Sequence, residues 1–179
     1  LSYFLDRTTY FPILLMYAVP ERGKTRIGRA WRHTVRRGIQ TVSLREAFLL
    51  RAAEDHQAGL FLDIVDLAET ARRERTEDIL LGRFEEGEKV PRVVDPKAGA
   101  FLDTKYYKVF GPTLLGSNKP IQEPLLSRCL VFSPPESTRS FPNDVSEAGG
   151  LALKNRLVAM RARNMGVPLP AVQKRYGGR

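Results

Sequence analysis

Phe11-Pro-Ile-Leu-Leu-Met-Tyr-Ala-Val-Pro-Glu-Arg-Gly-Lys-Thr25 is the stretch of sequence that decides the fold. Its first part, residues 11–19, is an uninterrupted apolar run, which is typical of a strand buried on both faces of a parallel sheet. After Gly23, apolar residues recur at steps of three and four from Ile27 to Val35, and arginines fill the other faces. This spacing predicts an amphipathic helix. A buried strand that leads through glycine into a helix is therefore expected here.

The turn between this strand and this helix has the residues that a phosphate-binding loop needs. Successive backbone N–H groups and a helix N-terminus favour a bound phosphate, a lysine reaches the terminal phosphates, and a hydroxyl holds magnesium. Lys24 and Thr25 follow Gly23 in that order, so we expect ATP and Mg²⁺ as cofactors. The usual pattern has glycine five positions before Gly23, where this chain has Ala18. The alternative is a solvent-exposed turn in which Lys24 is one more surface cation. The expected nucleotide-binding residues are Pro20, Glu21, Arg22, Gly23, Lys24, Thr25 and Arg26.

The segment Gly59-Leu-Phe-Leu-Asp-Ile-Val-Asp66 predicts a second buried strand, which ends in carboxylates. Asp63 would hold the magnesium through its water shell, together with the hydroxyl of the loop. Most ATPases that hydrolyse their nucleotide beside such a strand place glutamate directly after the aspartate, and here that position is Ile64. Asp66 is the nearby carboxylate that would substitute for it as a catalytic group. The alternative is that Asp66 caps the helix that begins at Leu67.

Two further polar residues stand at expected strand boundaries. Asn118 follows an apolar strand expected over residues 106–117, and its amide would position the water that attacks a γ-phosphate. The alternative is a turn residue before Lys119 and Pro120. Arg128 precedes a strand expected at 130–132, and its guanidinium would stabilise a phosphoryl transition state in the site of a neighbouring subunit. The alternative for Arg128 is a surface ion pair.

The rest of the chain alternates between strand and helix patterns. Ser43 and Glu46 predict a capping box that opens a helix to about Gln57, and residues 67–84 have a helical pattern. Residues 87–105 predict an irregular excursion or hairpin. We therefore expect an α/β fold of the P-loop NTPase type, with a mainly parallel central sheet flanked by helices and a small C-terminal helical segment. The expected domains are a core at 1–133, a proline-rich linker at 134–145 and a basic helical segment at 146–179.

The formal net charge of +9 and a pI of about 10.0 indicate a polyanionic partner. Nucleic acid is the first candidate and a membrane surface the second, and the alternative is a charge that serves solubility alone. The longest apolar run, Phe11 to Val19, is too short to span a bilayer, and the single cysteine excludes an internal disulfide. We therefore favour nucleic acid over a membrane as the partner and expect a cytoplasmic location. The expected DNA-binding cations, with Phe101, Tyr106 and Tyr107 interleaved, are Lys89, Arg92, Lys97, Lys105 and Lys108. The alternative is a solvated hairpin whose aromatic residues face the core.

Four segments resemble the P-loop ATPase domains of plasmid, phage and integrated-element replication proteins, which are often found beside primase modules. They are Pro20-Glu-Arg-Gly-Lys-Thr-Arg26, Leu60-Phe-Leu-Asp-Ile-Val-Asp66, Arg83-Phe-Glu-Glu-Gly-Glu-Lys-Val-Pro-Arg92 and Tyr107-Lys-Val-Phe-Gly-Pro112. Separately, Leu125-Leu-Ser-Arg-Cys129 is similar to the arginine-finger motif of clamp loaders, a branch of the AAA+ ATPases.

The resemblance implies an ATP-binding motor module that couples hydrolysis to translocation on, or unwinding of, single-stranded or forked DNA. It implies phosphate binding by Gly23-Lys24-Thr25, metal binding by Asp63, nucleotide sensing by Asn118 and a finger acting in trans at Arg128. It also implies a homo-oligomer, with a hexameric ring as one arrangement, and a primase as partner or fused domain. The phosphate loop is about two residues shorter than the family's usual Pro-Glu-x-x-Ser-Gly-Lys-Thr form, and Ile64 replaces the family's glutamate. Two alternatives remain. They are a hydrolysis-deficient DNA-binding scaffold and a clamp-loader-like subunit.

Overall fold

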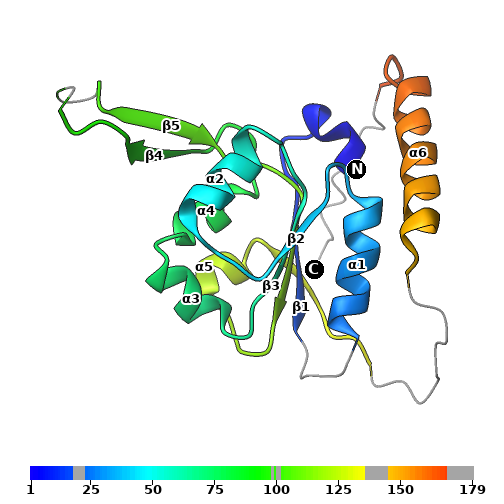
Figure 1. Ribbon diagram of the computed structural model, residues 1–179, viewed down its shortest axis with the longest axis horizontal. Helices are drawn as coiled ribbons and strands as arrows, with labels where there is room; N and C mark the ends of the chain where they lie inside the picture. Colours follow the sequence, from blue (N-terminus) through cyan, green and yellow to red (C-terminus); the bar gives the residue numbers. More distant parts are fainter. Residues whose placement is uncertain (18–22, 98, 100–101, 136–144, 169–179) are drawn as a thin grey trace, which may run out of the picture.

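The computed structural model describes residues 1–17, 23–97, 99, 102–135 and 145–168. Its centre is a five-stranded parallel sheet with the strand order β2-β3-β6-β1-β7 (Figure 1). The expected α/β class, with a mainly parallel central sheet flanked by helices, is confirmed. The strands of this sheet are β1 (Ile13–Tyr17), β2 (Ile39–Thr41), β3 (Leu60–Asp63), β6 (Thr113–Ser117) and β7 (Cys129–Phe132).

Helices cover both faces of the sheet, as Figure 1 shows edge-on. On one face lies α1 (Lys24–Thr34), and α6 (Glu147–Arg163) packs outside it, next to the 3₁₀ helix η1 (Ser2–Arg7). The other face carries the remaining helices. They are α2 (Glu46–Glu54), α3 (Leu67–Arg73), α4 (Glu77–Gly82) and α5 (Glu123–Leu126).

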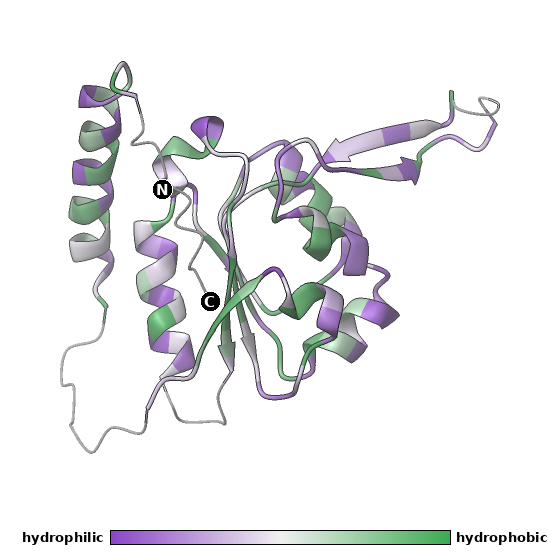
Figure 2. Ribbon diagram, turned by 180° about the vertical axis from the view of Figure 1, so that it is seen from behind, coloured by the Kyte–Doolittle hydropathy of each residue, from purple (hydrophilic) through white to green (hydrophobic). Residues whose placement is uncertain are grey.

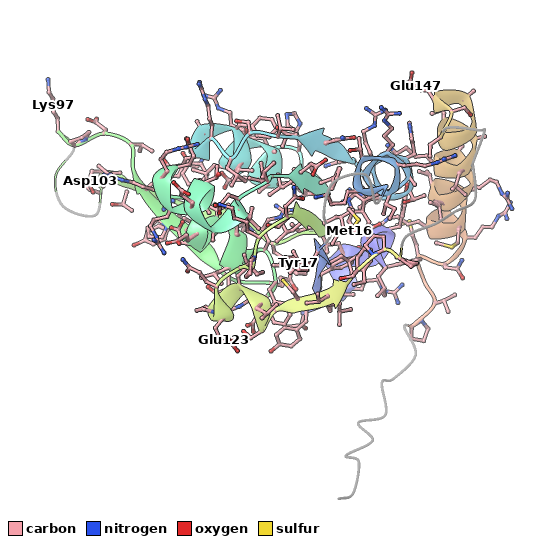
Figure 3. The ribbon with its side chains drawn as sticks, turned by 90° about the horizontal axis from the view of Figure 1, so that it is seen from below. Met16, Tyr17, Lys97, Asp103, Glu123 and Glu147 are labelled. Carbon is pink, nitrogen blue, oxygen red and sulfur yellow. The ribbon has the colours of Figure 1, made fainter. Side chains whose placement is uncertain are left out.

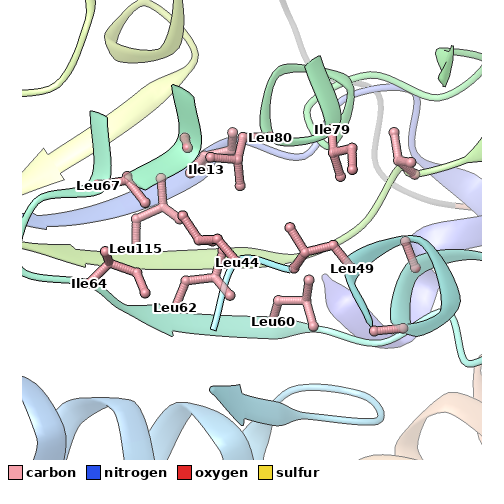
Figure 4. Close-up of a cluster of buried hydrophobic side chains, with 14 of the residues drawn as sticks. Ile13, Leu44, Leu49, Leu60, Leu62, Ile64, Leu67, Ile79, Leu80 and Leu115 are labelled. Atoms are coloured by element: carbon pink, nitrogen blue, oxygen red, sulfur yellow. The ribbon is translucent and has the colours of Figure 1, made fainter. Parts of the chain in front are cut away.

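The core has two parts because successive residues of a strand point to opposite faces. Ile13 and Leu15 join the larger cluster on the α2–α5 side, shown in Figure 4. Met16 and Phe61 form a smaller cluster on the α1 side. A Cβ atom at Gly28 of α1 would overlap the ring of Phe61, so the absence of a side chain there lets the helix lie close to the sheet. In Figure 2 the hydrophobic colour accordingly follows the central strands.

An antiparallel hairpin of β4 (Lys89–Val93) and β5 (Thr104–Lys108) projects from the body as an arm (Figure 1). The hairpin expected within 87–105 is therefore present. The single strand expected over 106–117 is wrong, because its two halves belong to different sheets. Gly111 and Pro112 separate them, and Pro112 offers only a carbonyl for pairing.

Two local expectations also need correction. Helix α2 begins at Glu46 with Arg45 as its N-cap, so there is no capping box with Ser43. The Glu46 carboxylate instead accepts a hydrogen bond from Arg92 of the arm. The expected helix over 67–84 is two helices, and the chain turns between them at Arg75, whose φ is +56°. In the part of the chain that the structure describes, no helix has the length and apolar character to cross a bilayer.

Arg83 ties together the amino-terminal edge of the sheet. Its guanidinium is fully buried and hydrogen bonds to the Thr113 hydroxyl, and it donates to the carbonyls of Val109 (3.0 Å), Ala58 (2.8 Å) and Pro112 (3.1 Å). These acceptors precede or begin β3 and β6. Burial lowers the pKa of this guanidinium to about 9. Arg83 therefore fixes the starts of β3 and β6, whose carboxyl ends lead to Asp63 and Asn118.

Candidate functional site

An open cleft of about 600 Å³ lies at the carboxyl edge of the sheet. The neighbouring strands β1 and β6 are followed by helices on opposite faces, α1 and α5, which places a ligand site outside their carboxyl ends in an open α/β sheet. The lining residues come from the start of α1 and from the ends of β3 and β6. They are Gly23, Lys24, Thr25, Arg26, Arg29, Asp63, Val65 and Asn118.

The first turn of α1 forms one wall of this cleft. Gly23 is the N-cap and has a φ of +77°, in the left-handed region that favours glycine. Gly23 provides no side-chain cap, so among the described residues the first backbone N–H groups of the helix and its dipole face the cleft. Lys24 and Arg26 add positive charge, so this wall has the chemistry of an anion site. The expected loop residues Pro20, Glu21 and Arg22 lie outside the described residues.

Thr25 and Asp63 meet across the cleft. The Thr25 Oγ1 donates a hydrogen bond to the Asp63 Oδ2 at 3.4 Å, although the two residues are 38 positions apart. Asp63 is the last residue of β3 and pairs in register with Gly116 of β6. A hydroxyl and a carboxylate are hard oxygen ligands of the kind that Mg²⁺ takes together with phosphate oxygens and water. The two residues expected to hold the metal therefore fit that role.

Asn118 lies at the same edge, directly after β6. Its backbone N–H donates to the Val65 carbonyl at 3.2 Å, which joins the exit of β6 to the exit of β3. Its Oδ1 is buried and accepts no hydrogen bond from the described residues. A buried acceptor without a donor is costly, so a water or ligand donor is expected at this atom.

Ile64, at the position of the expected glutamate, and Asp66, its expected substitute, have other roles in the structure. Ile64 is buried in the main core cluster. The Asp66 Oδ1 accepts the Glu69 N–H at 3.2 Å and so caps α3, while its Oδ2 pairs with Lys119 Nζ at 2.6 Å. That bond from Lys119, followed by the one from Glu69, lowers the pKa of Asp66. The capping alternative for Asp66 is confirmed, and the described lining of the cleft has Asp63 as its one carboxylate.

Arg128 lies at the opposite edge of the sheet. Its carbonyl accepts the N–H of Ile13, the first residue of β1, whereas the cleft lies beyond the last residue of that strand. Its guanidinium donates to the Pro124 carbonyl at 2.8 Å and lines a cleft of about 280 Å³ with Asp78, Glu85 and Glu88. Arg128 is therefore remote from the cleft at the carboxyl edge of its own chain's sheet.

The five cations expected to bind DNA lie on or beside the arm, and two of them have acidic partners. Arg92 contacts Glu46 and donates to the Asp78 carboxylate at 2.7 and 3.0 Å, and these acids raise its pKa. Lys105 pairs with Glu54 at 3.0 Å, which raises the pKa of its ammonium group.

The other three cations, Lys89, Lys97 and Lys108, are exposed. Lys97 lies near the tip of the arm, far from Tyr17 at the end of β1 (Figure 3). Tyr106 is 53% exposed, whereas Tyr107 packs against the main core, and Phe101 is outside the described residues.

Sequence reasoning missed two features of this edge. Arg29 lies one helical turn after Thr25 and lines the cleft, which its spacing in the helix would have indicated. The pairing of Lys119 with Asp66 has no signal in the sequence, because 53 positions separate them. No protein-family model matches this chain, and a search of curated proteins also gave no match. Its function is therefore inferred from the residues of the cleft.

Proposed function

We propose that the protein is an ATP-binding motor module of a mobile-element DNA replication protein, on a P-loop NTPase fold. It would couple ATP hydrolysis to translocation on DNA or to strand unwinding. The observation that carries this proposal is the hydrogen bond between Thr25 and Asp63 beside the start of α1, where the N-cap Gly23 provides no side-chain cap. A phosphate-binding turn, a hydroxyl and a strand-end carboxylate are the parts that a nucleotide and its magnesium need at one place.

Each residue of the cleft has a role in this proposal. Lys24 and the N–H groups at the start of α1 would bind the β- and γ-phosphates, and Thr25 and Asp63 would hold the magnesium. When bound, Mg²⁺ supplies positive charge that offsets the charge of the phosphates. Asn118 would orient the attacking water through its buried Oδ1, which has a free acceptor position among the described residues.

The charge and the arm support DNA as the partner. A net charge of +9 favours a polyanion, and the exposed Lys89, Lys97 and Lys108 lie on a projecting hairpin with the exposed Tyr106. Arg128, remote from its own cleft, would act on a neighbouring subunit of a homo-oligomer, with a hexameric ring as one arrangement. A primase would be a partner or a fused domain.

One observation favours a second candidate, a DNA-binding scaffold that binds nucleotide but does not turn it over. Ile64 is buried where a glutamate would orient water, and Asp66 is engaged by Lys119 and by the helix it caps. A clamp-loader-like subunit rests only on the sequence likeness around Arg128.

ATP turnover with and without single-stranded DNA separates these candidates. The motor proposal predicts turnover that DNA stimulates and that Lys24→Ala abolishes, while Arg72→Ala on the exposed side of α3 leaves it unchanged. Nucleotide binding without turnover, in the presence or absence of DNA, would favour the scaffold.

A further inference from the structure

Three bonds join the end of β6 and the turn after it to the segment after β3. Ile64 N–H donates to the Gly116 carbonyl at 3.0 Å, and Asn118 N–H donates to the Val65 carbonyl at 3.2 Å. The third is the ion pair between Lys119 Nζ and Asp66 Oδ2 at 2.6 Å, the one side-chain bond of the three. Asn118 makes the second bond itself and is adjacent in the chain to Lys119, which makes the third, so its position depends on both.

Ser117 makes this segment a tight turn. Its buried hydroxyl donates to the Lys119 carbonyl at 2.8 Å and accepts the Lys119 N–H at 3.3 Å. Because these two bonds restrain the backbone of residues 117–119, a displacement of Lys119 also displaces the backbone of Asn118. The direction in which Asn118 presents its amide to the cleft is thereby linked to the Lys119 side chain.

Asp66 is the fixed end of this pair. One of its oxygens caps α3 at the Glu69 N–H, and the other accepts the Lys119 ammonium group. Helix α3 packs into the main core through Leu67 and Ala71, so Asp66 has little freedom to move. Lys119 is therefore anchored to a packed helix rather than to a loop.

We propose that Lys119, paired with Asp66, is the positioning residue that holds Asn118 in place at the nucleotide cleft. This inference rests on the proposed function, since it gives Lys119 a role in the turnover of the same site. The Lys119 side chain is 60% exposed, and exposed ion pairs add little to folding stability. Replacing the Lys119 side chain should therefore change ATP turnover and leave the thermal midpoint of unfolding almost unchanged.

The test compares Lys119→Met, Lys119→Arg and Arg73→Met in the full chain. Lys119→Met should lower kcat for ATP about 10- to 100-fold with little change in KM, because small misplacements of a catalytic group cost this much. Lys119→Arg keeps a cation that reaches Asp66 and should recover most of the rate. Arg73→Met removes another exposed ion pair, the one between the last residue of α3 and Glu74, and should leave kcat unchanged.

Hydrogen exchange at the Asn118 backbone amide gives a second readout that does not need turnover. Lys119→Met should speed this exchange, and Lys119→Arg should restore its protection. Unchanged exchange in Lys119→Met would overturn the inference, and so would faster exchange with unchanged kcat.

Failure of the proposed function would look different from failure of this inference. It would appear as wild-type turnover that is absent or insensitive to Lys24→Ala, and the role of Lys119 would fall with it. Turnover that needs Lys24 but not Lys119 would overturn the inference alone.

Discussion

Thr25 and Asp63 share a hydrogen bond of 3.4 Å between the first turn of α1 and the end of β3. The contact exists because β1 and β3 are parallel strands of one sheet, with β6 between them, so that both end at the same edge. It brings a hydroxyl and a carboxylate beside a helix start whose N-cap, Gly23, provides no side-chain cap. This relationship is the observation on which the proposed nucleotide and magnesium site rests.

Asp63→Asn should remove the magnesium dependence of nucleotide binding. The amide keeps an oxygen near Thr25 but loses the negative charge that a divalent cation needs. The measurement is the thermal midpoint with a non-hydrolysable ATP analogue, with and without Mg²⁺. Asp55→Asn, at the exposed end of α2, is the matched control and should behave as wild type. An undiminished magnesium effect in Asp63→Asn would exclude Asp63 as a metal ligand.

Arg83→Lys should destabilise the fold although it preserves the charge. A lysine cannot reach the four acceptors that the guanidinium engages, which leaves buried carbonyls of Ala58, Val109 or Pro112 without donors. The expected loss is about 2–4 kcal/mol of unfolding free energy, measured by urea denaturation. Arg51→Lys on the exposed side of α2 should change stability little. Equal stability of the two variants would show that the Arg83 bonds contribute nothing.

The stability difference between wild type and Asp66→Asn should depend on pH. Lys119 and the Glu69 N–H lower the pKa of Asp66 below its ordinary value of 3.8 in the folded state. The ionised Asp66 carboxylate therefore contributes its full stabilisation above about pH 3.8. This contribution is lost as the pH falls through the lower, folded-state pKa. Unfolding free energies measured from pH 7 to pH 2 should converge for the two proteins below about pH 3.8. A difference that stays constant over this range would contradict a lowered pKa of Asp66 in the folded state.

Much of the site was predictable because its geometry follows from strand order. Lys24, Thr25, Asp63 and Asn118 each stand at the end of an apolar strand or the start of the next helix. The carboxyl ends of parallel strands meet at one edge of their sheet. The local sequence pattern was therefore enough to predict that these four residues lie at one cleft.

Residues whose partners lie far away in the sequence were not predictable in this way. Arg83 carries the pattern of a surface arginine, and its burial follows from acceptors that are 25 to 30 positions away. Glu46 fitted a capping box by spacing, but Arg92 of the arm takes its carboxylate. Side-chain pairing across elements depends on where loops and hairpins fold, which a local pattern does not specify.

Arg128→Ala should abolish the ATP turnover that depends on an assembled oligomer. Mixing these subunits with Lys24→Ala subunits should restore part of that turnover. Arg128→Ala subunits keep an intact cleft, while Lys24→Ala subunits keep the guanidinium that a neighbour needs. If both act across one head-to-tail interface, an equal mixture should recover about a quarter of the wild-type rate from the random pairing of subunits. Two variants that stay inactive when mixed would contradict a finger acting in trans.

The most direct test is thermal unfolding of wild type and Lys24→Ala with and without Mg²⁺ and a non-hydrolysable ATP analogue. A ligand that binds only the folded chain at about 100 times its Kd should raise the wild-type midpoint by about 5–10 °C. A nucleotide site at the start of α1 predicts this rise in wild type and in the control Arg72→Ala, and its loss in Lys24→Ala. An unchanged midpoint in wild type, or an equal rise in Lys24→Ala, would contradict a nucleotide site at the start of α1.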